Sequence, residues 1–201
     1  GEINTWDTSK ITSFNRLFSD KETFNDDISG WDVSNVVDME RAFAHAYEFN
    51  QDLSAWDVSS VKDMNHMFYV TKAFNQNISN WDVSNVEDMH WAFSRTDNFN
   101  QDISSWVVSK VTNMSSMFYN ASAFDQDISS WDISNVSNLG NMFGGDFLSE
   151  ENKCAVHASF QTNPAWPYSW CAQDCAGEWG GSAIADNCDA CSSNAEFIEI
   201  A

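Results

Sequence analysis

The feature that most constrains this chain is a tryptophan that recurs every 25 residues. The six copies follow one another without an insertion or a deletion, at Trp6, Trp31, Trp56, Trp81, Trp106 and Trp131. A strict period in this range is typical of proteins in which each repeat forms one coil and neighbouring coils share a core. The sequence therefore predicts a solenoid of about six coils over residues 1–146, followed by a different segment over residues 147–201.

Apolar residues also recur at fixed places in the coil. In the second coil, Val36, Met39 and Phe43 have the spacing i, i+3 and i+7, which is typical of one face of a short helix. The segment before each tryptophan, such as residues 74–79 (FNQNIS), places one inward apolar residue between polar ones and predicts a short parallel strand. We therefore expect an α/β repeat with one strand and one short helix in each coil.

An asparagine recurs at a third place in the coil. Its copies are Asn25, Asn50, Asn75 and Asn100, with Asp125 in the fifth position. Because buried polar groups need hydrogen-bond partners, this column predicts an asparagine ladder that bonds the backbone at a turn. The glutamine that follows each asparagine is expected to be exposed.

Two columns of acids flank the tryptophan. They include Asp32, Asp57, Asp82 and Asp132 after it, and Asp27, Asp52, Asp102 and Asp127 before it. One interpretation is a Ca²⁺ site built from carboxylate and carbonyl oxygens. A second is an Asx turn, in which the side chain accepts backbone N–H bonds, and a third is a solvated acidic face. Asn77 and Val107 interrupt the columns, which favours the turn over a metal ladder.

Charge and hydropathy limit the partners. The chain has 30 acidic and 9 basic residues and a formal net charge of -21, which repels nucleic acid and anionic membrane surfaces. No apolar run approaches the roughly 18 residues that would span a bilayer. We therefore expect protein, glycan or self-association partners, with neither nucleic acid binding nor direct membrane insertion.

All five cysteines lie in the C-terminal segment, at Cys154, Cys171, Cys175, Cys188 and Cys191. Such a density in a short acidic segment favours disulfides formed outside the cytosol, with one thiol left over. The pairs Cys171-x3-Cys175 and Cys188-x2-Cys191 also allow a zinc site. Aromatic residues in the same segment predict that it covers the last coil.

The repeat FN-Q-D-I-S-x-W-D-V-S-N-V-x-D-M-x-x-M-F resembles the BspA-like leucine-rich-repeat surface proteins over residues 2–143. Residues 174–191, DCAGEWGGSAIADNCDAC, are similar to short cysteine repeats of extracellular modular proteins. The first resemblance implies a leucine-rich-repeat-type solenoid. Both imply an extracellular or cell-surface location, and the first implies roles in adhesion.

The sequence offers no catalytic constellation. Its four histidines fall at four different positions of the repeat, so no column supplies a metal triad or a general base. Glycosylation sequons occur at Asn77, Asn113, Asn120 and Asn135, of which Asn120 is expected to be the most accessible. We expect a non-catalytic extracellular repeat protein that acts in adhesion or as a self-assembling surface component. The alternative is a module that binds Ca²⁺ or carbohydrate through the acidic or tryptophan columns, and no other cofactor is expected.

Overall fold

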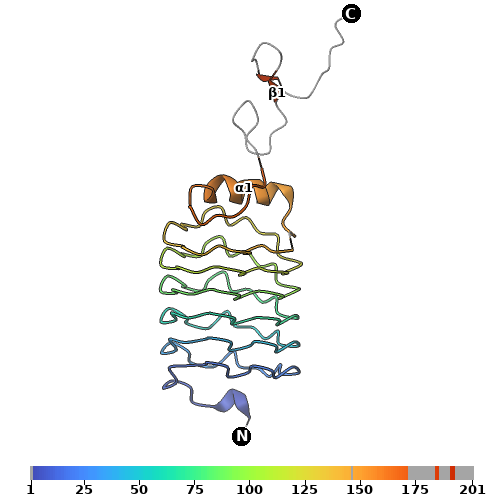
Figure 1. Ribbon diagram of the computed structural model, residues 1–201. Helices are drawn as coiled ribbons and strands as arrows, with labels where there is room; N and C mark the ends of the chain where they lie inside the picture. The colour runs from blue at the N-terminus through green and yellow to red at the C-terminus, as the bar shows by residue number, and fades with distance from the viewer. Residues whose placement is uncertain (1, 146, 172–183, 186–190, 193–201) are drawn as a thin grey trace, which may run out of the picture.

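The computed structural model describes residues 2–145, 147–171, 184–185 and 191–192. The chain up to residue 145 forms coils that are stacked along one axis, which we call the coil stack (Figure 1). Helix α1 (Glu150–Phe160) lies across the last coil, at the end of the stack opposite the N-terminus (Figure 1).

Little regular secondary structure lies outside α1. A 3-10 helix, η1 (Ile3–Thr5), precedes the first coil. Strands β1 (Ile184–Ala185) and β2 (Cys191–Ser192) pair antiparallel, with Ile184 opposite Ser192. Most of the described chain is therefore held by contacts between coils rather than by helices and sheets.

Neighbouring coils are joined by a regular backbone pattern. Isolated parallel bridges connect one column through all six coils: Ser13, Asp38, Asp63, Asp88, Asn113 and Asn138. Beside this column, alternate N–H groups donate to the next coil, as from Arg41 N to Asn65 O at 2.8 Å. The N–H groups between them close four-residue turns inside the coil, as from Ala44 N to Arg41 O at 3.1 Å. The backbone thus alternates between a partner in its own coil and one in the next.

The predicted helix is wrong, because the described part of the coil stack contains no α-helix. A helix would bond every N–H to the carbonyl four residues earlier, whereas here alternate N–H groups bond the next coil. Consecutive turns take the place of the helix, and every second turn has positive φ at its third residue, 55° at Arg41 and 61° at His45. Met39 and Phe43 are four residues apart, a spacing that fits successive turns as well as a helix.

Positive φ without glycine recurs in every coil. The two columns contain Arg16, Arg41, His66, Trp91, Ser116 and Asn141, and Asp20, His45, Val70, Arg95 and Asn120. For a β-branched residue such as Val70, at φ 58°, this conformation costs about 1–2 kcal/mol. The hydrogen bond from Val70 N to Ser94 O, at 2.9 Å, helps to offset that cost. The hydrogen bonds between coils therefore hold a backbone that the residues alone would not prefer.

The predicted strand is also wrong, because residues 74–79 form no strand and are linked to the neighbouring coil through side chains. Asn75 N donates to Asn50 Oδ1 at 2.9 Å, and the same bond recurs along the column. This confirms the asparagine ladder. Gln76 was expected to be exposed but is half-buried, because its Nε2 donates to Asn50 Oδ1 at 3.0 Å.

The predicted core is confirmed. Five of the repeated tryptophans are buried: Trp31, Trp56, Trp81, Trp106 and Trp131. Each indole N–H donates to a backbone carbonyl of the preceding coil, as from Trp81 Nε1 to Leu53 O at 3.0 Å. Two phenylalanine columns run beside them, and Phe68 in one lies 4.1 Å from Phe74 in the other, measured between ring centroids. These five tryptophans are therefore structural.

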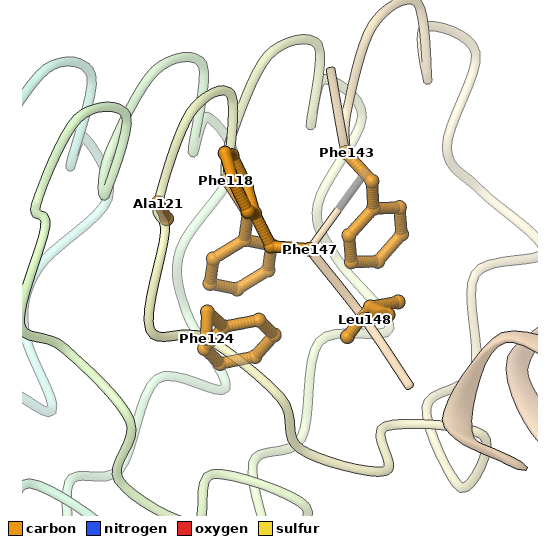
Figure 2. Close-up of a pocket in the computed structure, with 6 residues that line it drawn as sticks. All are labelled: Phe118, Ala121, Phe124, Phe143, Phe147 and Leu148. Atoms are coloured by element: carbon orange, nitrogen blue, oxygen red, sulfur yellow. The ribbon is translucent and has the colours of Figure 1, made fainter. Parts of the chain in front are cut away.

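One of the two phenylalanine columns ends a coil earlier than the other at the C-terminal end of the stack. Phe118 and Phe124 are stacked at 3.9 Å, but Phe143 has no phenylalanine six residues later. Phe147 and Leu148 occupy that region instead (Figure 2). The hollow left between these side chains has a volume of about 10 Å³, room for one water at most, so it is no ligand site.

Helix α1 and the segment after it cover the last coil, as the aromatic residues predicted. Ser149 caps α1, and Phe160 on this helix is fully buried. Asn152 Nδ2 donates to Asp125 Oδ1 at 2.7 Å, which continues the asparagine ladder into α1. A disulfide joins Cys154 on α1 to Cys171. By contrast, Trp6 at the first coil is 55% exposed, so the N-terminal end has no equivalent cover among the described residues.

Candidate functional site

The eight acids that sequence reasoning placed at a possible site all form Asx turns. In each, Oδ1 accepts the N–H of the serine two residues later, as from Ser34 N to Asp32 Oδ1 at 3.0 Å. Asn77 replaces an acid in the same role, because Ser79 N donates to its Oδ1 at 3.0 Å. The side chains are exposed. A neutral amide in this position shows that the turn does not need the charge.

Hydrogen bonds from serine lower the pKa of most of these acids. At Asp32 the Ser34 hydroxyl has the largest effect and the Ser34 N–H the next, and Asp82, Asp102 and Asp132 follow the same order. At Asp27 and Asp52 the backbone N–H has the larger effect, and in every case desolvation opposes the shift weakly. These six acids thus remain charged at neutral pH.

Metal binding by these columns stays a prediction. Within the described ranges, no group of three or more His, Cys, Asp and Glu side chains is arranged to hold a metal ion. The column before the tryptophan does line two open polar grooves. One, of about 360 Å³, includes Asp102, Gln126 and Asp127, and the other, of about 250 Å³, includes Asp27.

The four sequon asparagines differ in their exposure to solvent. Asn77 and Asn135 are exposed, although Asn135 Nδ2 donates to Ser109 O at 2.7 Å. Asn113 is half-buried in the bridge column, and Asn120, expected to be the most accessible, is half-buried as well. Asn120 lies in a tight turn, with φ 54°, which explains why its side chain is less accessible than expected.

Among the cysteines, the bond to Cys154 removes Cys171 from the alternative zinc site. Cys175 and Cys188 lie outside the described residues, and Cys191 belongs to β2. Their pairing remains a prediction.

Sequence reasoning missed a cluster on the bridged face of the stack, which we call the patch. It consists of residues from columns that vary along the stack: Arg41, His45, Tyr47, His66, Tyr69, His90, Trp91 and Tyr119. All eight are half-buried. On a stack whose other columns are nearly uniform, they form a distinct surface.

Trp91 lies at the centre of the patch. Its ring is parallel to that of His66, with centroids 5.5 Å apart, and stacks on Tyr119 at 5.9 Å. Tyr69 meets it edge-on at 5.1 Å. Small residues make room for the tyrosines: Tyr119 lies against Gly144, where a Cβ atom would clash with its ring. Large and small side chains of adjacent coils therefore interlock here, as they do in the core.

Polar contacts fix the imidazoles. His90 Nδ1 contacts Ser115 Oγ at 2.6 Å, and His66 Nδ1 contacts Asn65 Oδ1. Burial lowers the pKa of His66 to about 4, and the charge of Arg41 acts in the same direction. His66 is therefore neutral at physiological pH.

Charged groups border the imidazoles. Arg41 Nε is buried and lies 3.5 Å from Glu40 Oε1, without a hydrogen bond among the described residues. Burial raises the pKa of Asp63, in the adjacent bridge column, although the Asn65 N–H bond opposes this. The patch thus combines aromatic edges, neutral imidazole and one arginine, and acidic groups border it.

A signal for the patch exists in the sequence. The columns of Glu40, Ala44 and His45 change residue type from each coil to the next, and that of Arg41 does so from the second coil onwards, whereas the core and turn columns vary much less. Because neighbouring coils align residues about 25 apart, histidines at different repeat positions still meet: His66 contacts His90 at 5.3 Å between centroids. Variation within a strict repeat therefore marks the exposed, specialised face.

Comparison with known proteins identifies a family. A family described as "Mycoplasma protein of unknown function, DUF285" matches residues 1–90 and 48–153. No curated protein and no solved structure matches the chain. Within the described residues, no helix has the length and apolar character needed to cross a membrane.

Proposed function

The chain belongs to the DUF285 family, and on that premise we propose that it is a non-catalytic extracellular contact protein that binds partners through the patch. The observation that carries the proposal is the concentration of half-exposed aromatic and arginine side chains on one face of the stack. Tryptophan, tyrosine and arginine dominate the binding energy of protein interfaces. A partner that covers Trp91 and Tyr69 would therefore gain apolar contact on a pre-ordered surface.

Other features support a location outside the cell. The bond between Cys154 and Cys171 is of a kind that persists in oxidising compartments. The 25-residue repeat and the resemblance of the segment after it support a BspA-like surface protein with a leucine-rich-repeat-type solenoid. We propose an adhesive role at the cell surface, in which protein or glycan is the partner.

The test is a binding assay with the full chain coupled to beads, against purified extracellular-matrix proteins and arrayed glycans. Trp91→Ala should weaken binding to at least one probe by tenfold or more. Trp6→Ala is the matched control, since Trp6 is exposed but lies outside the patch. A probe that binds wild type and both variants equally would show that the patch is not the contact surface.

A second candidate is a module that binds Ca²⁺ or carbohydrate, which the polar groove around Asp102 and Asp127 favours. Carboxylate oxygens suit Ca²⁺, and a shallow polar groove suits a glycan. Asp102→Asn with Asp127→Asn should abolish such binding and keep the turns, as Asn77 does. Calorimetry with Ca²⁺ and with the glycans decides: no heat in wild type refutes this candidate.

A further inference from the structure

The face of the stack that carries the patch has a negative net charge. Three segments from successive coils bring the patch and both of its edges to this face: residues 38–48, 63–73 and 88–98. Together they contain six acids and three bases. Residues 13–23 of the first coil add two of each, and residues 113–123 of the fifth add no charge. A partner that covers this face must therefore bring positive charge.

The acids concentrate at the edge formed by the bridge column. Asp38, Asp63 and Asp88 occupy that column in successive coils, and Glu40 follows Asp38 by two residues. All four are half-buried. Burial raises the pKa of Asp63, and the charges of Asp88, Asp38 and Glu40 act in the same direction. Four carboxylates therefore lie close enough to repel one another.

The bases of this face are balanced by acids. Arg41 Nε lies 3.5 Å from Glu40 Oε1. Lys62, in the column before the bridge column, has its Nζ 3.4 Å from Glu87 Oε1. The bases of the opposite edge share their columns with acids: Lys72 with Glu22 and Asp97, and Arg95 with Asp20. Neither edge therefore carries an excess of positive charge.

The turn in the bridge column does not require the charge of Asp63. Its Oδ1 accepts Asn65 N at 2.8 Å, and Asn113 makes the same bond in its own coil, from Ser115 N at 3.2 Å. Among the described residues, no side chain donates to Asp63. The repulsion at Asp63 is thus not a cost of forming the turn, and a bound cation would relieve it.

The first coil shows how such carboxylates are satisfied. There Asn15 Nδ2 donates to Asp38 Oδ2 at 3.2 Å and to Glu40 Oε2 at 3.0 Å. One coil further on, the column of Asn15 holds Glu40, so Asp63 has a carboxylate where Asp38 has an amide donor. The position between Glu40 and Asp63 therefore suits a donor that carries positive charge.

Aromatic rings lie directly beside these acids. Asn65, which bonds Asp63, also contacts His66, and the His66 ring is parallel to that of Trp91. At the far edge, Lys72 Nζ already lies over a ring of the patch, 5.3 Å from the centroid of Tyr47. Among the described residues, no lysine or arginine lies over Trp91, although tryptophan is the ring that binds cations best.

Carboxylates next to exposed rings are complementary to guanidinium, which pairs with carboxylate and stacks on aromatic faces. We infer that the patch binds an arginine-rich segment of a partner protein, with some guanidinium groups paired with Asp63 and Glu40 and others stacked on Trp91. The inference rests on the proposed function, since it names the chemistry of the partner for the same surface. A metal ion fits less well, because no three ligating side chains converge within the described ranges.

Fluorescence anisotropy with the full chain tests the inference. At about 0.15 M salt, attraction by the overall charge is screened beyond about 8 Å, whereas close pairs persist. The probe is a labelled peptide of four Arg-Gly repeats, and matched peptides carry Lys or Gln in place of Arg. The Arg peptide should bind and the Gln peptide should not. The Lys peptide should bind at least threefold more weakly, because ammonium lacks the planar group that stacks.

A pair of charge variants tests the acidic edge. Asp63→Asn with Glu40→Gln should weaken binding of the Arg peptide at least tenfold, and the new asparagine keeps the turn as Asn113 does. Asp27→Asn with Asp102→Asn is the matched control, because it removes the same charge from turns that lie outside the patch. It should change the affinity less than twofold.

A second pair of variants tests the aromatic surface. Trp91→Asn should also weaken binding at least tenfold, and it suits the left-handed backbone, since Asn141 fills the same column at φ 55°. Trp6→Ala, which removes an exposed ring outside the patch, should leave the affinity unchanged. Urea unfolding of each variant shows that it is folded before its affinity is compared.

The outcomes separate the inference from the proposed function. Equal binding of the Arg peptide by wild type and both patch variants would reveal a general attraction to an acidic protein and would overturn the inference. Absence of binding by wild type overturns it as well. If a matrix protein or glycan then still binds through Trp91, the proposed function stands without the inference. If no probe of either assay responds to substitution of Trp91, both fail.

Discussion

The asparagine ladder permits a sharp prediction at Asn75, in the middle of the stack. Its Oδ1 accepts hydrogen bonds from Asn100 N at 3.0 Å and from Gln101 Nε2 at 2.8 Å. Asn75→Ala removes both acceptors, and each net hydrogen bond is worth about 0.5–1.5 kcal/mol. Because Asn75 and Asn100 are exposed, water replaces part of the loss. We expect the free energy of unfolding to fall by about 1–1.5 kcal/mol.

Urea unfolding measures this change. With a slope of about 2–3 kcal/mol/M, the midpoint should fall by about 0.5 M while the slope stays constant. Asn75→Asp is the matched control, because Asp125 fills the same place and its Oδ1 accepts Ser149 N at 2.8 Å. It should leave the midpoint nearly unchanged at neutral pH. Equal loss in both variants, or no loss in Asn75→Ala, would refute the ladder as a source of stability.

Three further predictions concern the core, the cap and pH. Phe68→Ala, which removes a fully buried ring, should lower the free energy of unfolding by about 3–5 kcal/mol in urea unfolding, whereas Phe24→Ala, at a half-buried end ring, should cost less. Cys171→Ser opens a loop with a sequence separation of 17 and should cost about 3 kcal/mol by the same assay; an unchanged midpoint would show that the disulfide does not stabilise the cap. His66 has a pKa of about 4 when folded, so the unfolded chain binds more protons between about pH 4 and 6.5, and stability should rise with pH across that window. Solvent screening of the half-exposed ring reduces this pH-dependent gain in the free energy of unfolding to about 1 kcal/mol. Urea titrations at several pH values should show that His66→Gln loses this gain.

The sequence predicted the period, the core columns and the asparagine ladder, because a strict repeat aligns identical residues in neighbouring coils. It could not distinguish turns from a helix, because the spacing of Met39 and Phe43 suits both. Turns form in place of a helix because the backbone bonds the neighbouring coil, as from Arg41 N to Asn65 O. The residue pattern of a single coil does not reveal these bonds. The parallel bridge therefore lies at Asp38 rather than in the segment before the tryptophan.

The patch escaped prediction for a related reason. His66 and His90 occupy different positions of the repeat and meet only when one coil is laid on the next. Repetition made the acidic columns the most prominent candidate site in the sequence. Those columns proved to be turn formers, as at Asp32 with Ser34. In a stack of near-identical coils, the residues that vary are the better guide to a contact surface.

The central claim is that the patch is a pre-assembled surface, and an NMR titration of the His66 imidazole tests it most directly. If His66 is packed against Trp91 and Tyr69 beside Arg41, its pKa should be about 4. Trp91→Ala should move that value upwards, because removing the indole exposes the ring to water. A His66 pKa near the unperturbed value of about 6.5 in the wild-type chain would contradict the account.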